Sequence, residues 1–286
     1  MDEFAGKVAV VTGAASGIGR ALAERWAGLD MKLALADIEA EPLDEVAEAL
    51  RAGGTDVLAV PTDVSDGDQV DAFARATLDE YGAMHLLCNN AGVGGGGPMW
   101  TLTEADWRWV LGVNLWGVIH GIRAFVPHLV AQGEGYVVNT ASVAGLSSPP
   151  MLGPYNASKH AVVTISETLR AELGMLADGD FGVTVVCPGW VRTRIADSER
   201  NRPDELRNPE TEDSPSRDEV AGALDSALET GMEPEELAEM VEQAVRDERL
   251  YVLTVDDWTP MLRERLETFV AEVDPPGAAA GASSPD

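Results

Sequence analysis

The sequence predicts an α/β protein: a doubly wound parallel sheet of about seven strands, with helices on both faces and a single domain over residues 1–273. Short runs rich in valine, leucine and alanine alternate with longer helical patterns along the chain. Such runs are typical of parallel strands that are buried on both faces. Glycine and polar residues follow the runs directly, where ligands bind such sheets. The 286 residues are enough to bury one large core.

The elements can be placed in order. Strands are expected at 7–11, 32–36, 57–60, 85–88, 135–140, 183–187 and 250–253. Helices are expected after the glycine turn that ends the first strand, at 41–52 and 67–81, from Thr103, from Pro154, and at 234–246 and 257–273. Thr103 is a typical N-cap residue with acidic residues in the turn after it. Pro154 suits the first turn of a helix, where its missing N–H has no partner to lose.

Composition and charge restrict the partners. The formal net charge is −29, which disfavours nucleic acid, anionic membranes and acidic carrier proteins. No apolar run reaches the roughly 18 residues of a membrane span, and the first residues lack the basic start and apolar stretch of a signal peptide. Cys88 and Cys187 lie within apolar runs, as buried reduced thiols do. We expect a cytoplasmic protein with no nucleic-acid or membrane partner.

The first strand is followed by a turn that contains Gly13, Gly17 and Gly19. Glycines let a backbone turn tightly and approach a ligand, and the N-terminus of the following helix offers N–H groups to a pyrophosphate. Ser16 and Ile18 lie within the same turn. A strand before and a helix after the turn favour dinucleotide binding.

Asp37 ends the second strand, at the distance along the chain where an acidic residue meets the adenosine ribose. Its carboxylate can accept both ribose hydroxyls and would repel a 2′-phosphate. Neither Ile38 nor Ser16 adds a positive charge. The pattern therefore favours NAD, with NADP less suited, although Asp37 can also be read as a strand-end turn residue.

Other strand ends supply further cofactor contacts. Asp63 can accept a hydrogen bond from the adenine amino group while Val64 packs on the ring. After the fourth strand, Ala91 and Gly92 let the chain pass close to the cofactor, and Asn90 can bridge neighbouring strands. The turn after the sixth strand would contact the carboxamide and phosphates through Pro188, Gly189, Val191 and Thr193.

Tyr155 and Lys159 stand four residues apart, so their side chains share one face of the helix that begins near Pro154. A free phenol has a pKa near ~10. An ammonium about 4 Å away favours the phenolate and is expected to lower this pKa by more than one unit. The Ser142 hydroxyl can hold a substrate oxygen against the same phenol. The pattern indicates general acid–base chemistry on an alcohol or carbonyl, although a lone Tyr-x-x-x-Lys also occurs on solvated helices.

Asn114 lies within an apolar stretch of the helix that starts at Thr103. A buried asparagine must be hydrogen-bonded. It either bonds a backbone kink or holds a water molecule beside Lys159. No metal site is predicted.

Several motifs occur together at ordered spacing, and in combination they resemble the short-chain dehydrogenase/reductase family, whose fold is Rossmann-type. The resemblance covers about 5–195 and extends through the strand near 250. It rests on Thr12-Gly13-x-x-x-Gly17-x-Gly19, Asn89-Asn90-Ala91-Gly92, Asn114, Ser142, Tyr155-x-x-x-Lys159 and Pro188-Gly189.

The resemblance implies a catalytic tetrad of Asn114, Ser142, Tyr155 and Lys159. Tyr155 would exchange a proton with the substrate oxygen while hydride passes to or from the nicotinamide, and Ser142 would place that oxygen. Lys159 would hold the nicotinamide ribose and lower the Tyr155 pKa, and Asn114 would anchor a water. The family also implies a homotetramer or homodimer, formed through the helices that contain Asn114 and Tyr155.

The expected substrate is a hydrophobic secondary alcohol or its ketone, because the residues expected around it are apolar. Beside Ser142 and Tyr155 these are Leu146, Met151, Leu152 and Trp190. Arg192 and Arg194 are either solvated or able to bind a carboxylate. The acidic, proline-containing stretch 195–233 is expected either to cover the substrate or to be a surface insertion. Residues 94–97 are expected to form a flexible loop, and 274–286 a disordered tail.

Two alternatives remain. The first is an NADPH-dependent ketoreductase of the acyl-carrier type, against which Asp37 and the net charge of −29 both count. The second is a non-catalytic sensor or scaffold that binds NAD. An intact tetrad makes that second alternative the weaker one.

Overall fold

The computed structural model describes residues 1, 3–208, 227–254 and 258–271. It divides into two compact units, Met1–Thr254 and Val255–Asp286. The first unit contains the sheet, and the described part of the second is the helix α9 (Trp258–Ala271). Extension of the sheet domain to residue 273 stays a prediction, and the predicted tail 274–286 lies outside the described residues.

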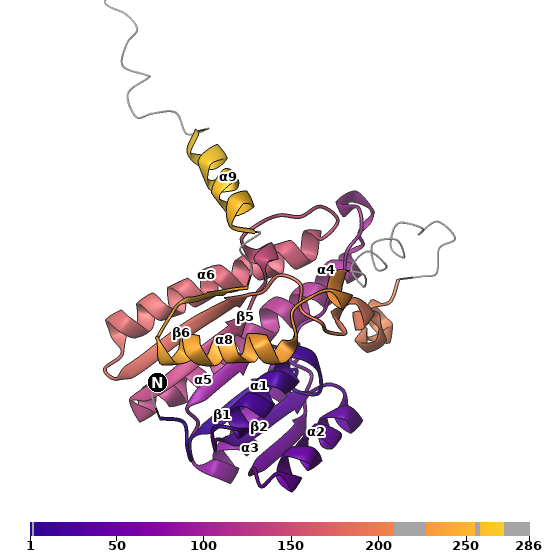
Figure 1. Cartoon of the computed structure of the whole chain (residues 1–286). Helices are drawn as coiled ribbons and strands as arrows, with labels where there is room; N and C mark the ends of the chain where they lie inside the picture. The colour runs from indigo at the N-terminus through magenta and orange to yellow at the C-terminus, as the bar shows by residue number, and fades with distance from the viewer. Residues whose placement is uncertain (2, 209–226, 255–257, 272–286) are drawn as a thin grey trace, which may run out of the picture. The chain divides into compact units, whose positions relative to one another are not determined.

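The sheet has seven strands in the order β3-β2-β1-β4-β5-β6-β7, and all neighbours are parallel (Figure 1). The strands are β1 (Val8–Thr12), β2 (Lys32–Asp37), β3 (Val57–Pro61), β4 (Leu86–Asn89), β5 (Glu134–Thr140), β6 (Asp180–Cys187) and β7 (Tyr251–Leu253). The chain winds outward twice from β1, first through β2 and then through β4. This confirms the predicted doubly wound, Rossmann-type sheet, whose ligand crevice lies beyond the carboxyl ends of β1 and β4.

The helices are α1 (Gly17–Ala27), α2 (Ala40–Ala52), α3 (Gly67–Tyr81), α4 (Glu104–Leu111), α5 (Gly117–Gln132), α6 (Gly153–Leu176) and α8 (Pro234–Arg246). One π-helical turn, η2 (Gly112–Trp116), joins α4 to α5. Short 3-10 turns are η1 (Met99–Thr101), η3 (Val143–Gly145), η4 (Ile195–Asn201) and η5 (Asp204–Leu206). Thr103 caps α4 in a reciprocal capping box with Asp106, as its position predicted.

The strands bury both faces because successive side chains point to opposite sides. Ala9 and Val11 of β1 pack with residues of α1, α2 and α8 on one face. Val10, between them, packs on the other face with residues of α3, α5 and α6. The helices of both layers hold the strand ends in place, so the loops that leave the carboxyl edge start from a rigid base.

Two features bear on the environment of the chain. Cys88 and Cys187 are buried and free, as expected. The helical run Glu104–Gln132 is long and apolar enough to cross a membrane by length and composition alone. A core helix meets the same test, and α5 within this run packs on β4 and β5.

Candidate active site

The crevice at the carboxyl edge is lined by glycines that the geometry requires. Gly13 and Gly17 have φ values of +67° and +52°, in the left-handed region that favours glycine. A Cβ on Gly13 would lie 2.8 Å from the Cα of Ala91, and one on Gly19 would lie 2.0 Å from the carbonyl oxygen of Gly13. The loops that follow β1 and β4 therefore touch through bare backbone and leave room for a ligand above them.

A hydrogen-bonded chain links this glycine turn to the lysine. The Thr12 hydroxyl accepts the N–H groups of Asn90 and Ala91 at 2.9 and 3.1 Å. The Asn90 amide donates to the Thr12 carbonyl at 3.1 Å and accepts from the Thr140 hydroxyl at 3.1 Å, so it bridges β1 and β5. Lys159 Nζ then donates to the Thr140 carbonyl at 3.0 Å. The glycine turn after β1 and the Lys159 side chain are therefore linked by a continuous chain of hydrogen bonds through Asn90 and Thr140.

Asp37 lies at the adenosine end of the crevice and is 8% exposed. Its carboxylate accepts the backbone N–H of Ala15, in the glycine turn, at 2.9 Å and that of Glu39 at 3.0 Å. Burial raises the pKa of Asp37, while these backbone hydrogen bonds oppose the increase. Ile38 beside it is 46% exposed and uncharged. Asp37 thus acts as a turn residue, and its role toward an adenosine ribose stays a prediction.

Asp63 and Val64, the predicted adenine contacts, form hydrogen bonds with other residues of the protein. One oxygen of Asp63 accepts from the backbone N–H and the hydroxyl of Ser65, at 2.9 and 2.7 Å. Val64 is buried, and its carbonyl oxygen lies 3.0 Å from His120 Nδ1. The Asp63 side chain therefore shapes the turn after β3, and its role toward an adenine stays a prediction.

The turn after β6 reaches the start of α1. A Cβ on Gly17 would lie 3.0 Å from the methyl group of Thr193. Ser16, the N-cap of α1, makes no side-chain capping hydrogen bond, and Ile18 packs partly buried against the core. The predicted phosphate-binding residues Ser16 and Thr193 are thus brought to the same helix N-terminus.

Backbone contacts hold the rest of that turn. The Pro188 carbonyl accepts the N–H of Val143 at 2.9 Å, which joins the turn to the loop that carries Ser142. The Gly189 N–H donates to the Thr254 hydroxyl at 2.9 Å, and Val191 is buried. The nicotinamide end predicted from these residues therefore lies next to the predicted catalytic serine.

The catalytic candidates converge beside Gly92. Lys159 Nζ lies 5.5 Å from the centroid of the Tyr155 ring, so both side chains lie on one face of α6. A Cβ on Gly92 would lie 3.4 Å from Asn114 Oδ1 and 3.6 Å from Lys159 Nζ. The Ser142 hydroxyl lies near enough to lower the pKa of the phenol, while it accepts the Ala144 N–H at 3.1 Å and donates to the Pro188 carbonyl at 3.4 Å. Position 92 therefore lies directly against the Asn114 and Lys159 side chains.

The electrostatics differ from the expectation drawn from spacing. Burial raises the pKa of Tyr155, and the hydrogen bond from Ser142 opposes this increase only in part. The phenol ring packs against an apolar cluster that contains Trp109 and Val110, where a phenolate is poorly solvated. Burial also lowers the pKa of Lys159 to about 8. The expected decrease of the Tyr155 pKa is therefore wrong for the protein alone, because desolvation of the phenol outweighs its interaction with Ser142.

Asn114 is fully buried in the π-helical turn and bonds backbone rather than an open site. Its amide nitrogen donates to the Val93 carbonyl at 2.9 Å, and its oxygen accepts the Val93 N–H at 2.8 Å. The same nitrogen contacts the Ser158 hydroxyl at 3.3 Å. These bonds fix the loop just after Gly92, as the structural alternative expects, and a water held by Asn114 beside Lys159 stays a prediction. π turns are frequent at functional sites.

The glycine-rich loop 94–97, expected to be flexible, is held by close packing. A Cβ on Gly94 would lie 2.9 Å from the Ile195 carbonyl oxygen, and one on Gly96 would lie 2.2 Å from that of Met151. The Gly97 N–H donates to the Met151 carbonyl at 2.7 Å. Met151 itself has a φ of 71°, rare for a residue with a side chain. These glycines are needed for close approach of two loops.

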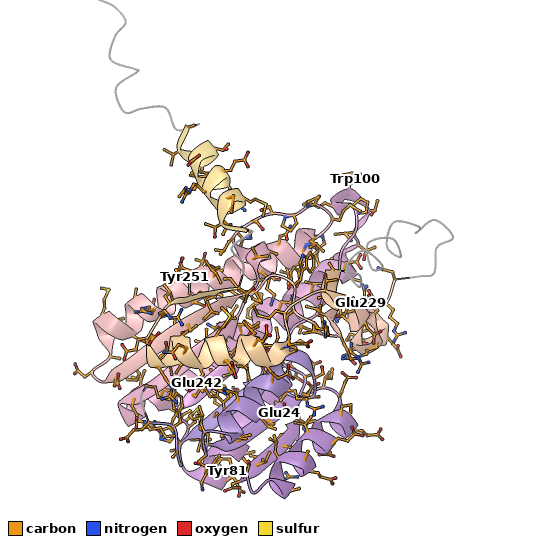
Figure 2. All side chains as sticks on the ribbon, viewed as in Figure 1. Glu24, Tyr81, Trp100, Glu229, Glu242 and Tyr251 are labelled. Atoms are coloured by element: carbon orange, nitrogen blue, oxygen red, sulfur yellow. The ribbon has the colours of Figure 1, made fainter. Side chains whose placement is uncertain are left out.

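The expected substrate residues divide by exposure. Ser142 is buried, Leu146, Met151 and Leu152 are half-buried, and Trp190 is exposed. Trp100 of η1 is 87% exposed at the tip of its loop (Figure 2). Figure 2 also shows that the molecule presents acidic side chains such as Glu24 and Glu229 on its surface, in keeping with the net charge.

Both arginines that follow β6 are engaged in ion pairs. Arg192 pairs with Glu233 and donates to the Glu229 carbonyl at 3.0 Å. Arg194 pairs with Asp197 at 3.0 Å. Neither is held ready for a substrate carboxylate, so the arrangement favours an uncharged substrate.

Sequence reasoning missed the residues that hold down the start of the 195–233 segment. Arg202 is only 2% exposed at its side chain, pairs with Asp106 at 2.9 Å, and stacks over the Trp109 ring at 4.9 Å. Leu206 packs against the apolar cluster that also contacts Tyr155. No local pattern could have signalled an ion pair between residues so far apart in the chain. The part 209–226 lies outside the described residues.

Among the described residues, no group of three or more His, Cys, Asp or Glu side chains could hold a metal ion. The groups that lie together in the site are the phenol of Tyr155, the ammonium of Lys159 and the hydroxyl of Ser142. Set beside a dinucleotide crevice, these groups can move a proton on an alcohol while its hydride is taken up. That is the chemistry of nicotinamide-dependent oxidoreductases.

Comparison with known sequences identifies the family within that class. The family model described as short chain dehydrogenase matches residues 7–204. The chain belongs to the short-chain dehydrogenase family, as its motifs indicated.

Several solved and curated proteins are similar along nearly the whole chain. A short chain dehydrogenase/reductase from Burkholderia phymatum, solved in complex with NAD, is 47% identical with a TM-score of 0.92, covering 96% of this chain and 99% of that one. The C alpha-dehydrogenase of a Sphingobium species is 34% identical over 96% of this chain and 88% of the relative. The 1-deoxy-11-beta-hydroxypentalenate dehydrogenase of Streptomyces arenae is 33% identical over 91% and 86%.

Proposed function

We propose that this protein is an NAD-dependent oxidoreductase that interconverts a hydrophobic secondary alcohol and its ketone, with Tyr155 as general acid and base. The observation that carries the proposal is the convergence of Tyr155, Lys159 and Ser142 beside Gly92, at the end of the glycine-lined crevice. When bound, the nicotinamide accepts or supplies the hydride. The residues proposed to hold the dinucleotide are Gly13, Ser16, Gly17, Ile18, Gly19, Asp37, Ile38, Asp63, Val64, Asn90, Ala91, Gly92, Tyr155, Lys159, Pro188, Gly189, Val191 and Thr193.

The side chains divide the work of proton transfer. In oxidation Tyr155 Oη takes the hydroxyl proton of the alcohol, and in reduction it returns that proton to the ketone oxygen. Ser142 donates its one hydroxyl hydrogen to the same substrate oxygen and so holds that oxygen beside the phenol. Lys159, fixed by its bond to the Thr140 carbonyl, places positive charge beside the phenolate as it forms. Asn114 forms two hydrogen bonds with the backbone of Val93 and so fixes the loop that borders the proposed site.

The pH dependence of this reaction follows from the raised pKa of Tyr155. The base must be deprotonated for oxidation, so kcat/KM for the alcohol is expected to rise as pH increases through the alkaline range. The acid must be protonated for reduction, so kcat/KM for the ketone is expected to be level near neutral pH and to fall at high pH. Ser142→Ala removes the bond that lowers this pKa, and should move the alkaline rise to higher pH. Rate profiles in both directions test this, and an unshifted profile in the variant would contradict it.

Asp37 supports a preference for NAD, since its carboxylate lies where a 2′-phosphate would be repelled. We expect kcat/KM for NAD to exceed that for NADP by about 100-fold, the scale of a like-charge contact. Asp37→Asn keeps an oxygen for a backbone N–H but removes the charge, and should reduce the ratio at least about tenfold. Asp56→Asn, at an exposed ion pair with Lys32, is the control. Equal use of both cofactors by the unaltered protein would show that Asp37 does not select.

The proposed lining, Leu146, Met151, Leu152 and Trp190, is apolar, and Arg192 and Arg194 are engaged in ion pairs, which together support a hydrophobic substrate. Two relatives are named as dehydrogenases of hydroxyl compounds, 1-deoxy-11-beta-hydroxypentalenate and 2-(R)-hydroxypropyl-CoM, which supports the alcohol group alone. The test is a screen of secondary alcohols of graded size and ring content, followed by NADH absorbance.

We also propose that the protein is a homo-oligomer in the cytoplasm. Trp116 and Val130 are exposed on the apolar helical run Glu104–Gln132, which is suited to packing against a second copy. The buried free thiols of Cys88 and Cys187 suit a reducing compartment. Light scattering of the purified protein should give the mass of a dimer or tetramer. The acyl-carrier ketoreductase and the non-catalytic sensor are the alternatives that the NADP comparison and the alcohol screen test.

A further inference from the structure

Residues 195–208, here called the strap, are fixed firmly at their catalytic end. The Arg202 guanidinium is buried between Asp106 and the Trp109 ring, and Arg202 Nε also donates to the Leu206 carbonyl at 2.8 Å. Leu206 packs against the cluster that contacts Tyr155. Separating this buried pair would leave an uncompensated buried charge, so we take it as the anchor of the strap.

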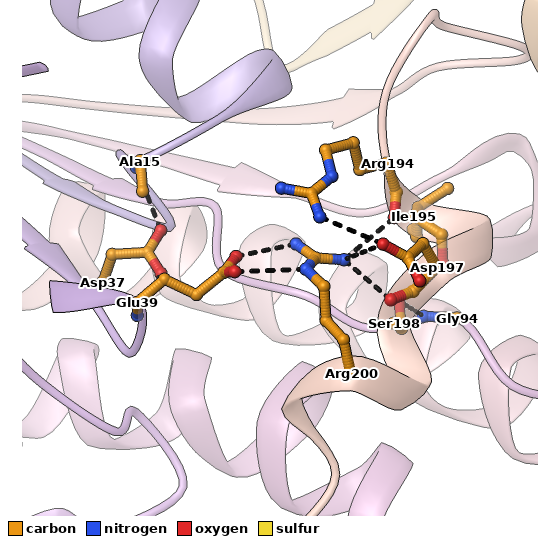
Figure 3. Close-up of polar contacts among 9 residues, drawn as sticks. All are labelled: Ala15, Asp37, Glu39, Gly94, Arg194, Ile195, Asp197, Ser198 and Arg200. Atoms are coloured by element: carbon orange, nitrogen blue, oxygen red, sulfur yellow. Dashed lines mark hydrogen bonds and ion pairs between the residues drawn. The ribbon is translucent and has the colours of Figure 1, made fainter. Parts of the chain in front are cut away.

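Two residues before this anchor, the strap is held by a more accessible ion pair, Arg200 with Glu39 (Figure 3). Arg200 Nε and Nη2 donate to the two carboxylate oxygens of Glu39 at 3.2 and 2.7 Å, a bidentate arrangement. The two side chains are 22% and 19% exposed, so water can reach them. Arg200 Nη1 also donates to the carbonyls of Arg194 and Asp197, at 3.2 and 2.8 Å, and thereby holds η4 in shape.

The partner residue Glu39 belongs to the adenosine end of the crevice. Its backbone N–H donates to one oxygen of Asp37, whose other oxygen holds Ala15 of the glycine turn (Figure 3). The strap also reaches the loop after β4, because Ser198 Oγ accepts the Gly94 N–H at 2.9 Å. β1 lies between β2 and β4 in the sheet. A segment tied to the turn after β2 and to the loop after β4 therefore spans the edge where the glycine turn lies.

We propose that the Arg200–Glu39 ion pair is a latch that holds the strap across the dinucleotide crevice, and that its opening controls how fast the cofactor exchanges. Arg200 is then a positioning residue that acts through the strap. The proposal rests on the proposed function insofar as the dinucleotide occupies this crevice. The buried anchor at Arg202 keeps the strap attached while the latch opens.

The test compares Glu39→Ala, Arg200→Ala and the double variant in the full chain. Arg108→Gln, which breaks the exposed pair with Glu104 on α4, is the matched control. Hydrogen–deuterium exchange without cofactor reports opening of 195–201, and stopped-flow fluorescence reports dissociation of NADH. Glu39→Ala should raise both rates by about 3- to 10-fold, the range that a half-buried bidentate pair supports. Because the Glu39 carboxylate is tied to the strap chiefly through Arg200, Glu39→Ala should add little in the Arg200→Ala background, whereas Arg200→Ala also loses the bonds that shape η4.

Unchanged exchange in Glu39→Ala would overturn the latch, and so would effects that simply add in the double variant. Faster exchange with unchanged NADH dissociation would overturn the control of cofactor release. Failure of the unaltered protein to bind NADH would instead count against the proposed function. In that case the exchange measurement, which needs no cofactor, still decides whether Arg200 and Glu39 hold the strap closed.

Discussion

Tyr155→Phe is expected to reduce turnover of the best alcohol by about 10²–10⁴-fold, the usual contribution of a positioned general acid or base. The reason is that only the phenol oxygen lies where it can exchange a proton with the substrate oxygen held by Ser142. The ring, which packs against Trp109 and Val110, keeps its shape in phenylalanine. Removal of one hydroxyl should therefore leave the fold and NADH binding close to those of the unaltered protein.

The control for this variant is Tyr81→Phe. The Tyr81 hydroxyl donates to the Leu33 carbonyl at 3.1 Å, near the start of β2 and away from the carboxyl edge. Its loss should change turnover less than twofold. Measurements of kcat with alcohol and of NADH affinity by fluorescence separate the two roles. Equal turnover in Tyr155→Phe and the unaltered protein would remove Tyr155 from the mechanism.

Lys159→Met is expected to lower turnover by about 100-fold or more while leaving the protein at least as stable near neutral pH. The buried ammonium is needed beside the phenolate, but burial makes it costly, as its pKa of about 8 shows. Methionine fills similar space without charge. It leaves the Thr140 carbonyl without its donor, which offsets part of the gain. Lys32→Met, at an exposed ion pair, is the matched control.

The same variant gives a pH test with a definite sign. The pKa of Lys159 is lower in the folded protein, about 8, than its ordinary value of 10.5. Below pH 8 the amine is protonated in both states, and the cost of the buried charge is fully present. Between these two values only the folded state loses the proton, so stability should rise with pH, by about 3 kcal/mol at most. The difference in unfolding free energy between the unaltered protein and Lys159→Met should follow this rise; a constant difference would contradict it.

The fold could be predicted because its signals are local. Each strand is a short apolar run, and the predicted runs fall on β1 to β7 with ends that differ by a few residues. The helix starts at Thr103 and Pro154 follow from capping and from the missing N–H of proline. Glycines that the sequence marked at positions 13, 17 and 19 are required by contacts shorter than a side chain allows.

The rest of the site depends on contacts between distant segments. Arg202 with Asp106, and Arg200 with Glu39, join parts of the chain that no spacing rule relates. The direction of the Tyr155 pKa shift could not be predicted either. The spacing of Tyr155 and Lys159 indicates an ammonium near the phenol, but it does not indicate the apolar cluster that packs against the phenol ring. Helical spacing also left open what Asn114 binds. In the structure Asn114 lies in a π turn, and its side-chain amide is hydrogen-bonded to the backbone of Val93.

The central claim is that a buried phenol, placed by Lys159 and Ser142 over a dinucleotide crevice, exchanges a proton with an alcohol as hydride leaves it. The most direct measurement is the formation of NADH from NAD by the purified protein with a panel of hydrophobic secondary alcohols, run beside Tyr155→Phe. The account predicts alcohol-dependent NADH formation that the variant loses although it still binds NADH. NADH binding without turnover of any alcohol, or of any matching ketone in reverse, would contradict it.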